Sequence, residues 1–487
     1  MSKVIGILYY LVLKHMFNIF LTKGHFKMAK GIMQILASME DFDNNVDENV
    51  DFVEAAEVET QLLEANEEGA VVEEMVEELE VAEEAAEALE SLITSLEAIS
   101  ENGGMDQNAA VMYRIAQESI YSRLGMTVES SSLESFSSSS SRYSATVLSL
   151  EEEKSRFRQV IDSIWKFIQE TARKFVAWLK SYLTALGSTE RRAKALKEKI
   201  NKDKNIKFEG KLTEKQQEQF GRFAGTSEFA KASVIDMSID YASFLDTFKK
   251  ANFGESLVKV QESLVTTAEK LNKDGGSVDG SDINKINEGF ATIVKALASS
   301  NSVVNDTNTS KKTIGTIISK AADKVSDVLG ISNDTKQEKP QITVTGARTT
   351  VGGLCVGGFS SSNSIGLVAA TRQQEENLKY TGVLPASAQE ATKVLDNVLD
   401  IVATQKALND SVNKAVANPK KLDKLVASRK DEGASAETRK LLQGYRKTFG
   451  ILVQISTAVS ASSTTVSKGL LDLVQISMKS APKEENA

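Results

Sequence analysis

KSRFRQVIDSIWKFIQETARKFVAWLKSYLTAL, residues 154–186, is the stretch that decides the fold. Its apolar side chains recur at steps of three and four residues, which places them along one face of an α-helix. They are Phe157, Val160, Ile161, Ile164, Ile168, Phe175, Val176, Leu179 and Leu183. Basic residues and both tryptophans, Trp165 and Trp178, are interspersed. The pattern predicts a long helix, and packing into a bundle is favoured over contact with a membrane surface or nucleic acid.

Further helices are predicted on both sides of the Gly-rich segment that follows residue 340. The same periodicity predicts helical structure at about 226–272, 281–298, 311–329, 387–408 and 436–480. Ser387 and Glu390 form a capping-box pattern after Pro385, and Gly330 fits the end of the 311–329 helix. All four prolines lie at position 340 or beyond, so no proline interrupts a helix before that point. We therefore predict a mainly α protein, an extended helical bundle.

A Gly-rich segment interrupts the helical pattern. QITVTGARTTVGGLCVGGFSSSNSIGLVAA, residues 341–370, alternates β-branched residues with glycines, which predicts two or three short strands or a flexible insertion. Its glycines do not fit the phosphate-binding pattern G-x-x-x-x-G-K-[ST]. Cys355 lies among apolar residues and is expected to be a small buried hydrophobe rather than a nucleophile.

The residue inventory disfavours the commonest enzyme classes. The chain has one cysteine, Cys355, and two histidines, His15 and His25, which excludes an internal disulfide framework and a Cys/His zinc cluster. Both histidines lie upstream of Met28, in a stretch that we do not expect to belong to the working protein. A Ser-His or Cys-His nucleophilic site is therefore not expected. Asp236, Asp240 and Asp246 share one predicted helix, but spacings of four and six do not bring all three to one face. We expect no catalytic residue, cofactor or metal.

Charge divides the chain into an acidic front and a basic body. Residues 31–113 hold 24 acidic residues and no Lys or Arg. Residues 1–134 carry a formal charge of −20, and the whole chain carries −9, so residues 135–487 carry +11. Within the front, VVEEMVEELEVAEEAAEALESL, residues 71–92, keeps a rough helical period; an amphipathic helix and a disordered solvated tail both remain open. Removal of the front would unmask a positive field that favours phosphate groups.

The first residues admit two interpretations. Residues 4–21 form an apolar run that Lys14 and His15 interrupt, and no small-residue cleavage pattern follows it. We favour a translation start at Met28, with the upstream stretch as an artefact of the chosen start codon. The alternative is a membrane-associated helical protein that is anchored through residues 4–21.

A serine tract joins the acidic front to the basic body. ESSSLESFSSSSSR, residues 129–142, has no periodic apolar pattern and is typical of an exposed linker, where proteases cut. Triplets of a small residue, any residue and glutamate occur in and around it. They are Ser132-Leu133-Glu134, Ser149-Leu150-Glu151 and Ala88-Leu89-Glu90.

Small-x-Glu triplets after an acidic N-terminal stretch resemble the propeptide junctions of internal head proteins in large tailed bacteriophages. The inner-body proteins of giant phiKZ-like phages are the most similar, over about the first 200 residues. The resemblance implies that a prohead protease cuts after the glutamate and that the acidic propeptide helps to assemble the prohead core. It also implies that the mature protein stays in the head with the genome and sometimes leaves with it.

The densest positive charge follows the 154–186 helix. STERRAKALKEKINKDKNIKFEGK, residues 188–211, is the first choice for a non-specific contact with double-stranded DNA, since Lys and Arg neutralise phosphates without reading bases. A solvated helix face is the open alternative. The candidate contacts are Arg191, Arg192, Lys194, Lys197, Lys199, Lys202 and Lys204.

These observations predict a structural virion protein with six regions. In order, they are a doubtful extension at 1–30, an acidic propeptide at 31–128, a Ser-rich linker at 129–153, a basic helical body at 154–339, a Gly-rich insertion at 340–380 and a C-terminal helical region at 381–487. We expect location inside the phage head, and in the host cytoplasm during assembly. The expected partners are the prohead protease, other head or core proteins, packaged DNA and further copies of the chain.

Overall fold

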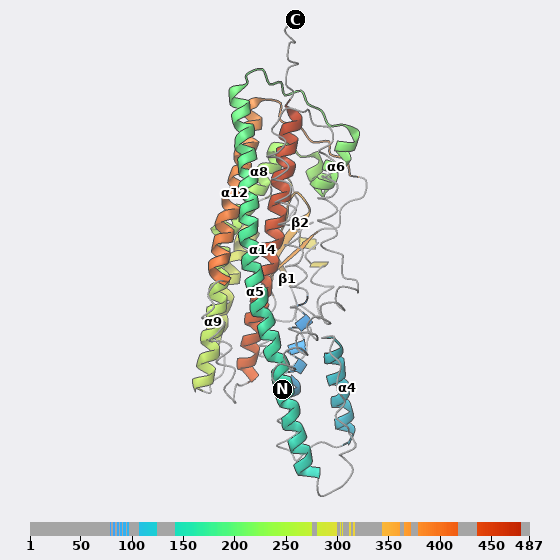
Figure 1. Ribbon diagram of the computed structural model, residues 1–487. Coiled ribbons are helices and arrows are strands. Elements are labelled where there is room, and N and C mark those ends of the chain that lie inside the picture. Colours follow the sequence, from blue (N-terminus) through green and yellow to red (C-terminus); the bar gives the residue numbers. More distant parts are fainter. Residues whose placement is uncertain are drawn as a thin grey trace, which may run out of the picture. The chain divides into compact units, whose positions relative to one another are not determined.

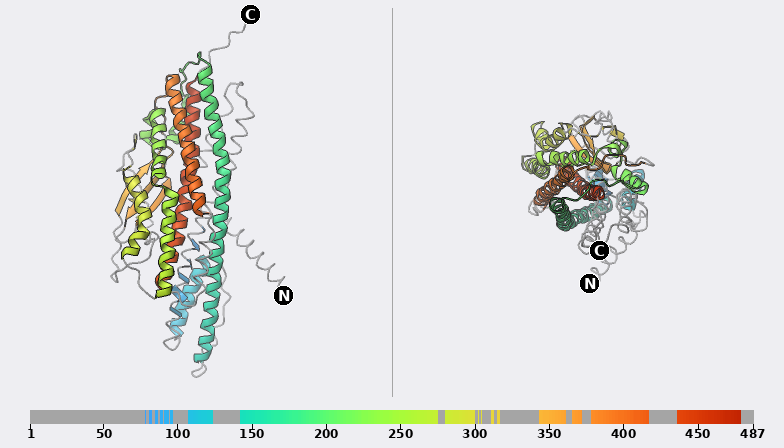
Figure 2. Two further views of the ribbon diagram at one scale, coloured as in Figure 1. Left: turned by 90° about the vertical axis from the view of Figure 1, so that its left-hand side faces the viewer. Right: turned by 90° about the horizontal axis from the view of Figure 1, so that it is seen from above.

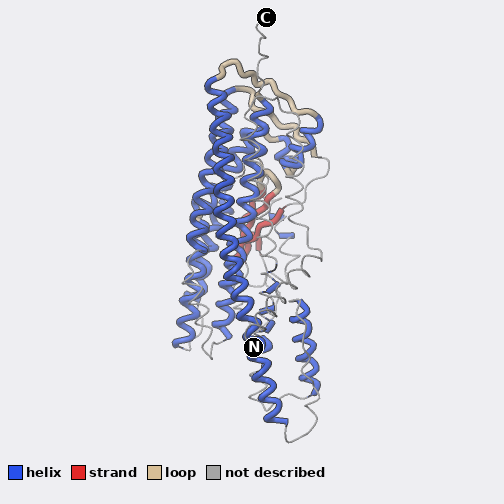
Figure 3. Tube along the Cα trace, viewed as in Figure 1, coloured by secondary structure: helices blue, strands red, loops and turns tan. Residues whose placement is uncertain are grey.

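The computed structural model describes residues 107–123, 142–274, 280–299, 343–360, 365–371, 378–416 and 436–478, with scattered positions at 78–96 and 302–316. These residues are predominantly helical, with one small sheet, so the predicted mainly α fold is confirmed (Figures 1 and 3). They belong to two compact units. The first contains the described residues between Val81 and Trp165, and the second contains those from Lys166 onward.

In the first unit, aromatic packing centres on Phe157, which is fully buried. Helix α4, Gln107–Arg123, places Tyr113 and Tyr121 with ring centroids 6.1 and 6.2 Å from that of Phe157. The positions described between 78 and 96 are helical. Their buried residues recur at steps of one, three and four, which favours the helical interpretation of the acidic front at these positions. They are Ala82, Ala85, Ala86, Leu89, Ile93 and Leu96.

Helix α5, Arg142–Lys202, contains the whole stretch from which the bundle was predicted. Phe175, Trp178 and Tyr182 are buried and stack along the helix, with successive ring centroids 5.7 and 5.3 Å apart. The expectation that this helix packs into a bundle is confirmed, because Phe175, Trp178 and Tyr182 lie inside the protein rather than on a surface.

The region predicted to be helical at 226–272 is helical in three segments. They are α7, Ser227–Lys231, α8, Val234–Lys250, and α9, Phe253–Asp274. Ser233 caps α8, since its Oγ accepts from the backbone N–H of Asp236 at 3.0 Å. Asn252 separates α8 from α9 with a φ of 48°. The preceding helix α6, Glu214–Ala224, ends at Gly225, whose φ is 76°.

The Gly-rich segment forms an antiparallel sheet in the order β1-β2-β3, which confirms the predicted short strands. The strands are β1, Thr343–Thr349, β2, Leu354–Ser360, and β3, Ile365–Thr371. Gly352 and Gly353 make the tight turn between β1 and β2 with φ of 84° and 77°. Cys355 is fully buried beside Ala347 and Phe359, as expected.

Glycine also lets a helix lie close to this sheet. Helix α10, Gly280–Ser299, contacts all three strands. A Cβ at Gly358 of β2 would lie 2.4 Å from Cγ2 of Val294, so no larger residue fits without movement of α10. Because α10 spans Gly280–Ser299, the predicted 281–298 helix is confirmed. Gly358 allows this helix to pack closely on the sheet. Of the predicted 311–329 helix, the described positions 311, 312, 315 and 316 are helical, and the rest, with Gly330, lies outside the described residues.

Two long helices complete the bundle, α12, Ala388–Val416, and α14, Ala436–Ser477. Both confirm the predicted C-terminal helices, although α12 runs past the expected end at 408. Ser387 caps α12 by accepting from Glu390 N–H at 3.2 Å. The Glu390 carboxylate accepts from the N–H of Ala386, one residue before the expected partner in a capping box.

Helix α14 is the centre of the bundle. It contacts α9, α12, α8, α6 and strands β2 and β3, and Figure 2 shows it enclosed by neighbouring elements. No side chain described between Leu441 and Met478 is exposed. Within the described residues, Lys447–Ser477 is the stretch long and apolar enough to cross a membrane, with 67% of its apolar window buried. This burial identifies a core helix of the bundle.

Candidate nucleic-acid interface and buried polar network

The last turns of α5 have one face toward the bundle and one toward solvent. Ala193, Leu196 and Ile200 are buried and recur every three or four residues. The basic residues of the 188–211 stretch that lie on α5 occupy positions outside this buried stripe. Because charged side chains flank the buried stripe on both sides, their roles depend on what each one contacts.

Arg192 and Lys197 tie α5 to its neighbours. Arg192 Nη2 donates to Asp472 Oδ1 of α14 at 2.5 Å and to Gln475 Oε1 at 2.9 Å. Lys197 Nζ lies 2.5 Å from Asp396 Oδ1 of α12. The structure therefore uses these two sequence-predicted DNA contacts for helix packing.

Glu190 joins two helices through two lysines. Its carboxylate accepts from Lys194 at 2.5 Å on α5 and from Lys406 at 2.5 Å on α12. The hydrogen bonds to Lys194 and Lys406 lower the pKa of Glu190 to about 2. Half-buried Glu190 therefore stays ionised in all but strongly acidic solution.

The remaining sequence-predicted contacts are exposed and define what we call the basic face. Lys194 and Lys202 each pair with a glutamate four residues earlier, Glu190 and Glu198, yet stay more than half exposed. Lys199 and Lys204 make no ion pair within the described part of the chain. The members of the basic face are Arg191, Lys194, Lys199, Lys202 and Lys204.

The basic face continues into the loop between α5 and α6, which the sequence analysis did not single out. Exposed Lys207 and Lys211 lie on this loop. Gly210 N–H donates to Ser477 O at 3.2 Å and fastens the loop to the end of α14. A Cβ at Gly210 would lie 1.8 Å from Ile476 O, so the contact requires glycine. Beside the loop, an open groove of about 550 Å³ separates Asn201 of α5 from the first turns of α12.

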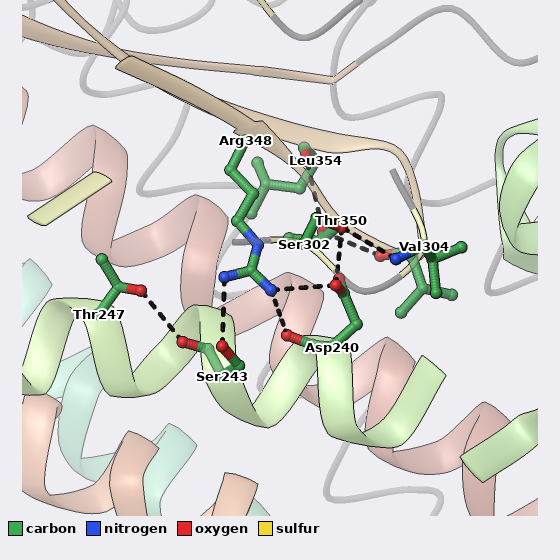
Figure 4. A network of polar contacts seen from close by, with 9 residues as sticks. Asp240, Ser243, Thr247, Ser302, Val304, Arg348, Thr350 and Leu354 are labelled. Carbon is green, nitrogen blue, oxygen red and sulfur yellow. Dashed lines mark hydrogen bonds and ion pairs between the residues drawn. The ribbon is translucent and has the colours of Figure 1, made fainter. Parts of the chain in front are cut away.

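A second charged cluster has a buried ion pair at its centre and joins the sheet to α8 (Figure 4). Arg348 Nη2 donates to the backbone oxygen of Asp240 at 2.6 Å and to its Oδ1 at 3.1 Å. Ser302 Oγ donates to the same carboxylate at 2.7 Å. Burial lowers the pKa of the Arg348 guanidinium, and the charge of Asp240 opposes that shift.

The three aspartates considered from the sequence thus have structural partners. Asp240 pairs with Arg348. Asp236 Oδ2 accepts from the capping Ser233 Oγ at 2.7 Å, and Asp246 pairs with Lys250 at 2.6 Å. Among the described residues, no three His, Cys, Asp or Glu side chains gather closely enough to hold a metal ion.

The candidate cleavage triplets lie in different environments. Ser132-Leu133-Glu134 lies outside the described residues. Ser149-Leu150-Glu151 lies in the helical backbone of α5. Ala88 and Leu89 are helical, and Leu89 is fully buried, whereas Glu90 lies outside the described residues.

Comparison with known proteins gives one match. A family model described as phiKZ-like phage internal head proteins matches residues 34–475, well beyond the first 200 residues that carry the sequence resemblance. No curated protein and no solved structure matches the chain. The matched range includes α4 through most of α14, so it spans both compact units.

Proposed function

The chain belongs to the phiKZ-like phage internal head proteins, and from this premise we propose that it is a processed, DNA-associated component of the head interior. Membership makes it a structural protein of the phage head. We propose three further properties, namely proteolytic processing, binding to DNA and the surface through which DNA is bound. The proposal rests on the charge asymmetry of the chain, because residues 1–134 have a formal charge of −20 and residues 135–487 have one of +11.

A prohead protease cuts after Glu134. Proteases act on exposed, locally unfolded chain, and a serine tract without apolar periodicity has the composition expected of such a segment. Helical backbone around Ser149–Glu151, and at Ala88 and Leu89, makes the other two triplets poorer substrates in the folded chain. The mature protein would then begin at Ser135.

Cleavage converts an acidic protein into a basic one. Before it, the acidic front competes with phosphate groups for the lysines of the body and keeps the body away from nucleic acid. Afterwards the body carries a net positive charge in the same compartment as the packaged genome. Duplex DNA releases condensed counterions when such a body neutralises its phosphates, so the association strengthens as the salt concentration falls.

The basic face makes the contact with double-stranded DNA. Its five side chains are exposed, whereas Arg192 and Lys197 are engaged with α14 and α12. Lysine and arginine on a helix surface bind phosphates without a preference for sequence. The protein therefore coats DNA non-specifically and assembles with other head or core proteins and with copies of itself.

Sequencing the N-terminus of the protein recovered from phage heads tests the processing. Cleavage after Glu134 gives a chain that starts at Ser135, and cleavage after Glu151 gives one that starts at Glu152. A chain from heads that still contains Glu40 through Glu101 would refute both the processing and the electrostatic switch. The membrane-associated alternative predicts an intact N-terminus and sedimentation with lipid.

A salt titration on duplex DNA tests the contact. The full-length chain, with a recognition site for a specific protease in place of residues 132–134, is folded first and cut afterwards. We expect tight binding at low salt only after the cut. Changing the five residues of the basic face to Gln should lower the slope of log affinity against log salt by up to about 4.5, since each phosphate contact contributes about 0.9.

The matched control changes five exposed lysines elsewhere to Gln, with the same loss of charge. They are Lys231, Lys249, Lys259, Lys285 and Lys295. An equal loss of slope in both variants would assign binding to diffuse charge rather than to the basic face. No binding by the cut wild-type chain at low salt would refute the DNA association itself.

A further inference from the structure

The central helix α14 carries a stripe of small polar residues inside the bundle. Six serines and threonines recur through its middle turns, and each is at most 2% exposed. They are Ser456, Thr457, Ser460, Ser463, Thr464 and Ser467. Buried hydroxyl groups are costly unless they are hydrogen-bonded, and those of Ser456, Thr457 and Ser467 have no partner among the described residues.

The middle of the stripe is well satisfied. Tyr182 of α5 bonds to Ser460 O and to the Thr464 hydroxyl, and Tyr241 Oη of α8 lies 3.1 Å from Ser463 Oγ. Gln405 of α12 donates to Ser460 Oγ at 2.9 Å and accepts from Ser463 Oγ at 2.8 Å. This network fixes the register in which α12 lies against α14.

The next turn of the same interface is not satisfied. Asn409 Nδ2, Asn413 Oδ1 and Ser456 Oγ are buried atoms without a hydrogen-bond partner among the described residues. Asn409 and Ser456 are 0% and 1% exposed. Asn409 already accepts from Gln405 at 2.8 Å and from Ser460 at 3.3 Å through its Oδ1, so only its amide nitrogen is left over.

The register places these three residues on the facing sides of α12 and α14. Asn409 and Asn413 lie four residues apart on α12 and therefore share a face. On α14, Ser456 lies four residues before Ser460, which bonds to Asn409. Gln405 of α12 bonds to both Ser460 and Ser463, whereas Asn409, one turn later on α12, bonds to Ser460. The contacts therefore move backward along α14 as α12 advances, which means that the two helices run antiparallel. One further turn along α12 brings Asn413 toward Ser456.

We propose that Asn409, Asn413 and Ser456 form an internal binding site for an ordered water molecule. The three groups supply a donor, an acceptor and a hydroxyl that can serve as either, which is the complement of one water. The groups are neutral and include one obligate donor, an amide N–H, so the set does not suit a cation. The water completes the polar seam between α12 and α14 one turn beyond Gln405.

Oxygen-17 relaxation dispersion of water in a solution of the full chain counts long-lived internal waters directly. Asn413→Leu removes the acceptor and fills the space, so we expect one long-lived water fewer than in the wild-type chain. Ser467→Ala is the control, because its buried hydroxyl also has no hydrogen-bond partner among the described residues but lies three turns away. It should leave the count unchanged.

Thermal unfolding gives a second, independent test that does not depend on Asn413→Leu folding. Ser456→Ala removes a partner of the bound water and should lower Tm by about 2 °C relative to the wild-type chain. Ser467→Ala removes an unpaired hydroxyl and should leave Tm unchanged or raise it. The proposal is overturned if Ser456→Ala behaves as Ser467→Ala does, or if Asn413→Leu folds and retains the full count of long-lived waters.

Discussion

Arg348 of β1 and Asp240 of α8 form an ion pair inside the protein, with side chains that are 2% and 0% exposed. The guanidinium carbon also lies 5.8 Å from the ring centroid of Phe244. These contacts fasten the sheet to the helical bundle across 108 residues of sequence.

Replacement of Arg348 by Met should destabilise the protein by about 3–5 kcal/mol, because it leaves the Asp240 carboxylate buried without its cation. Denaturant unfolding monitored by Trp fluorescence measures the loss. The double variant Arg348→Met with Asp240→Leu should recover most of it, since neither charge is then buried. A double variant as unstable as the single one would show that the pair itself, rather than the stranded charge, provides the stability.

The buried Tyr182 and Tyr241 should set the alkaline limit of stability. Burial raises the pKa of both hydroxyls well above the usual value of 10. The unfolded chain releases these protons from about pH 10 upward while the folded chain keeps them, so their contribution is lost as pH rises above 10. Tyr182→Phe should reduce the slope of unfolding free energy against pH in that range by about 1.4 kcal/mol per unit.

The check on this prediction is absorbance at 295 nm, which follows ionised tyrosine. Of the nine tyrosines, Tyr182, Tyr241 and Tyr380, whose pKa burial also raises well above 10, should ionise only when the chain unfolds. A smooth titration of all nine before unfolding would contradict it. Tyr445, whose pKa burial raises to about 12, should ionise earlier than these three.

Glu190 should contribute to folding stability, and this contribution should be lost in acid. Its pKa of about 2 lies below its unfolded value, so the stabilisation is full above about pH 4.5 and is lost as pH falls toward 2. Because the side chain is 30% exposed, we expect only about 1 kcal/mol. Glu190→Gln should therefore lower Tm at pH 7 and match the wild-type chain near pH 2. An equal difference at both pH values would argue against the ionic origin.

Gly358 should be intolerant of any side chain. Gly358→Ala places a Cβ 2.4 Å from Val294 Cγ2 and should cost about 1–3 kcal/mol by pushing α10 from the sheet. Val294→Ala in the same chain should recover part of that loss. The control is Gly187→Ala in α5, where a Cβ meets nothing within 4 Å, and it should stabilise the chain by about 0.5–1 kcal/mol. Equal effects at both glycines would refute the close approach.

Most of the local structure follows from the order of the amino acids alone. Periodic apolar residues predict α5, α10, α12 and α14 because a helix buries one face in any bundle it joins. The glycines and β-branched residues after Gln341 predict the strands, and the surroundings of Cys355 predict its burial. The acidic front and the serine tract are likewise properties of composition, and they carry the resemblance that the family match extends.

Only the tertiary structure decided which charges are free and which are used for packing. Arg192 and Lys199 belong to the same basic run in the sequence, yet Arg192 meets an aspartate 280 residues away and Lys199 meets solvent. Asp240 and Arg348 carry no local sign of their pairing, and neither do Asn409 and Ser460. Pairing of charges and hydrogen-bonding groups depends on distances between elements far apart in the chain, and helical periodicity contains no information about those distances.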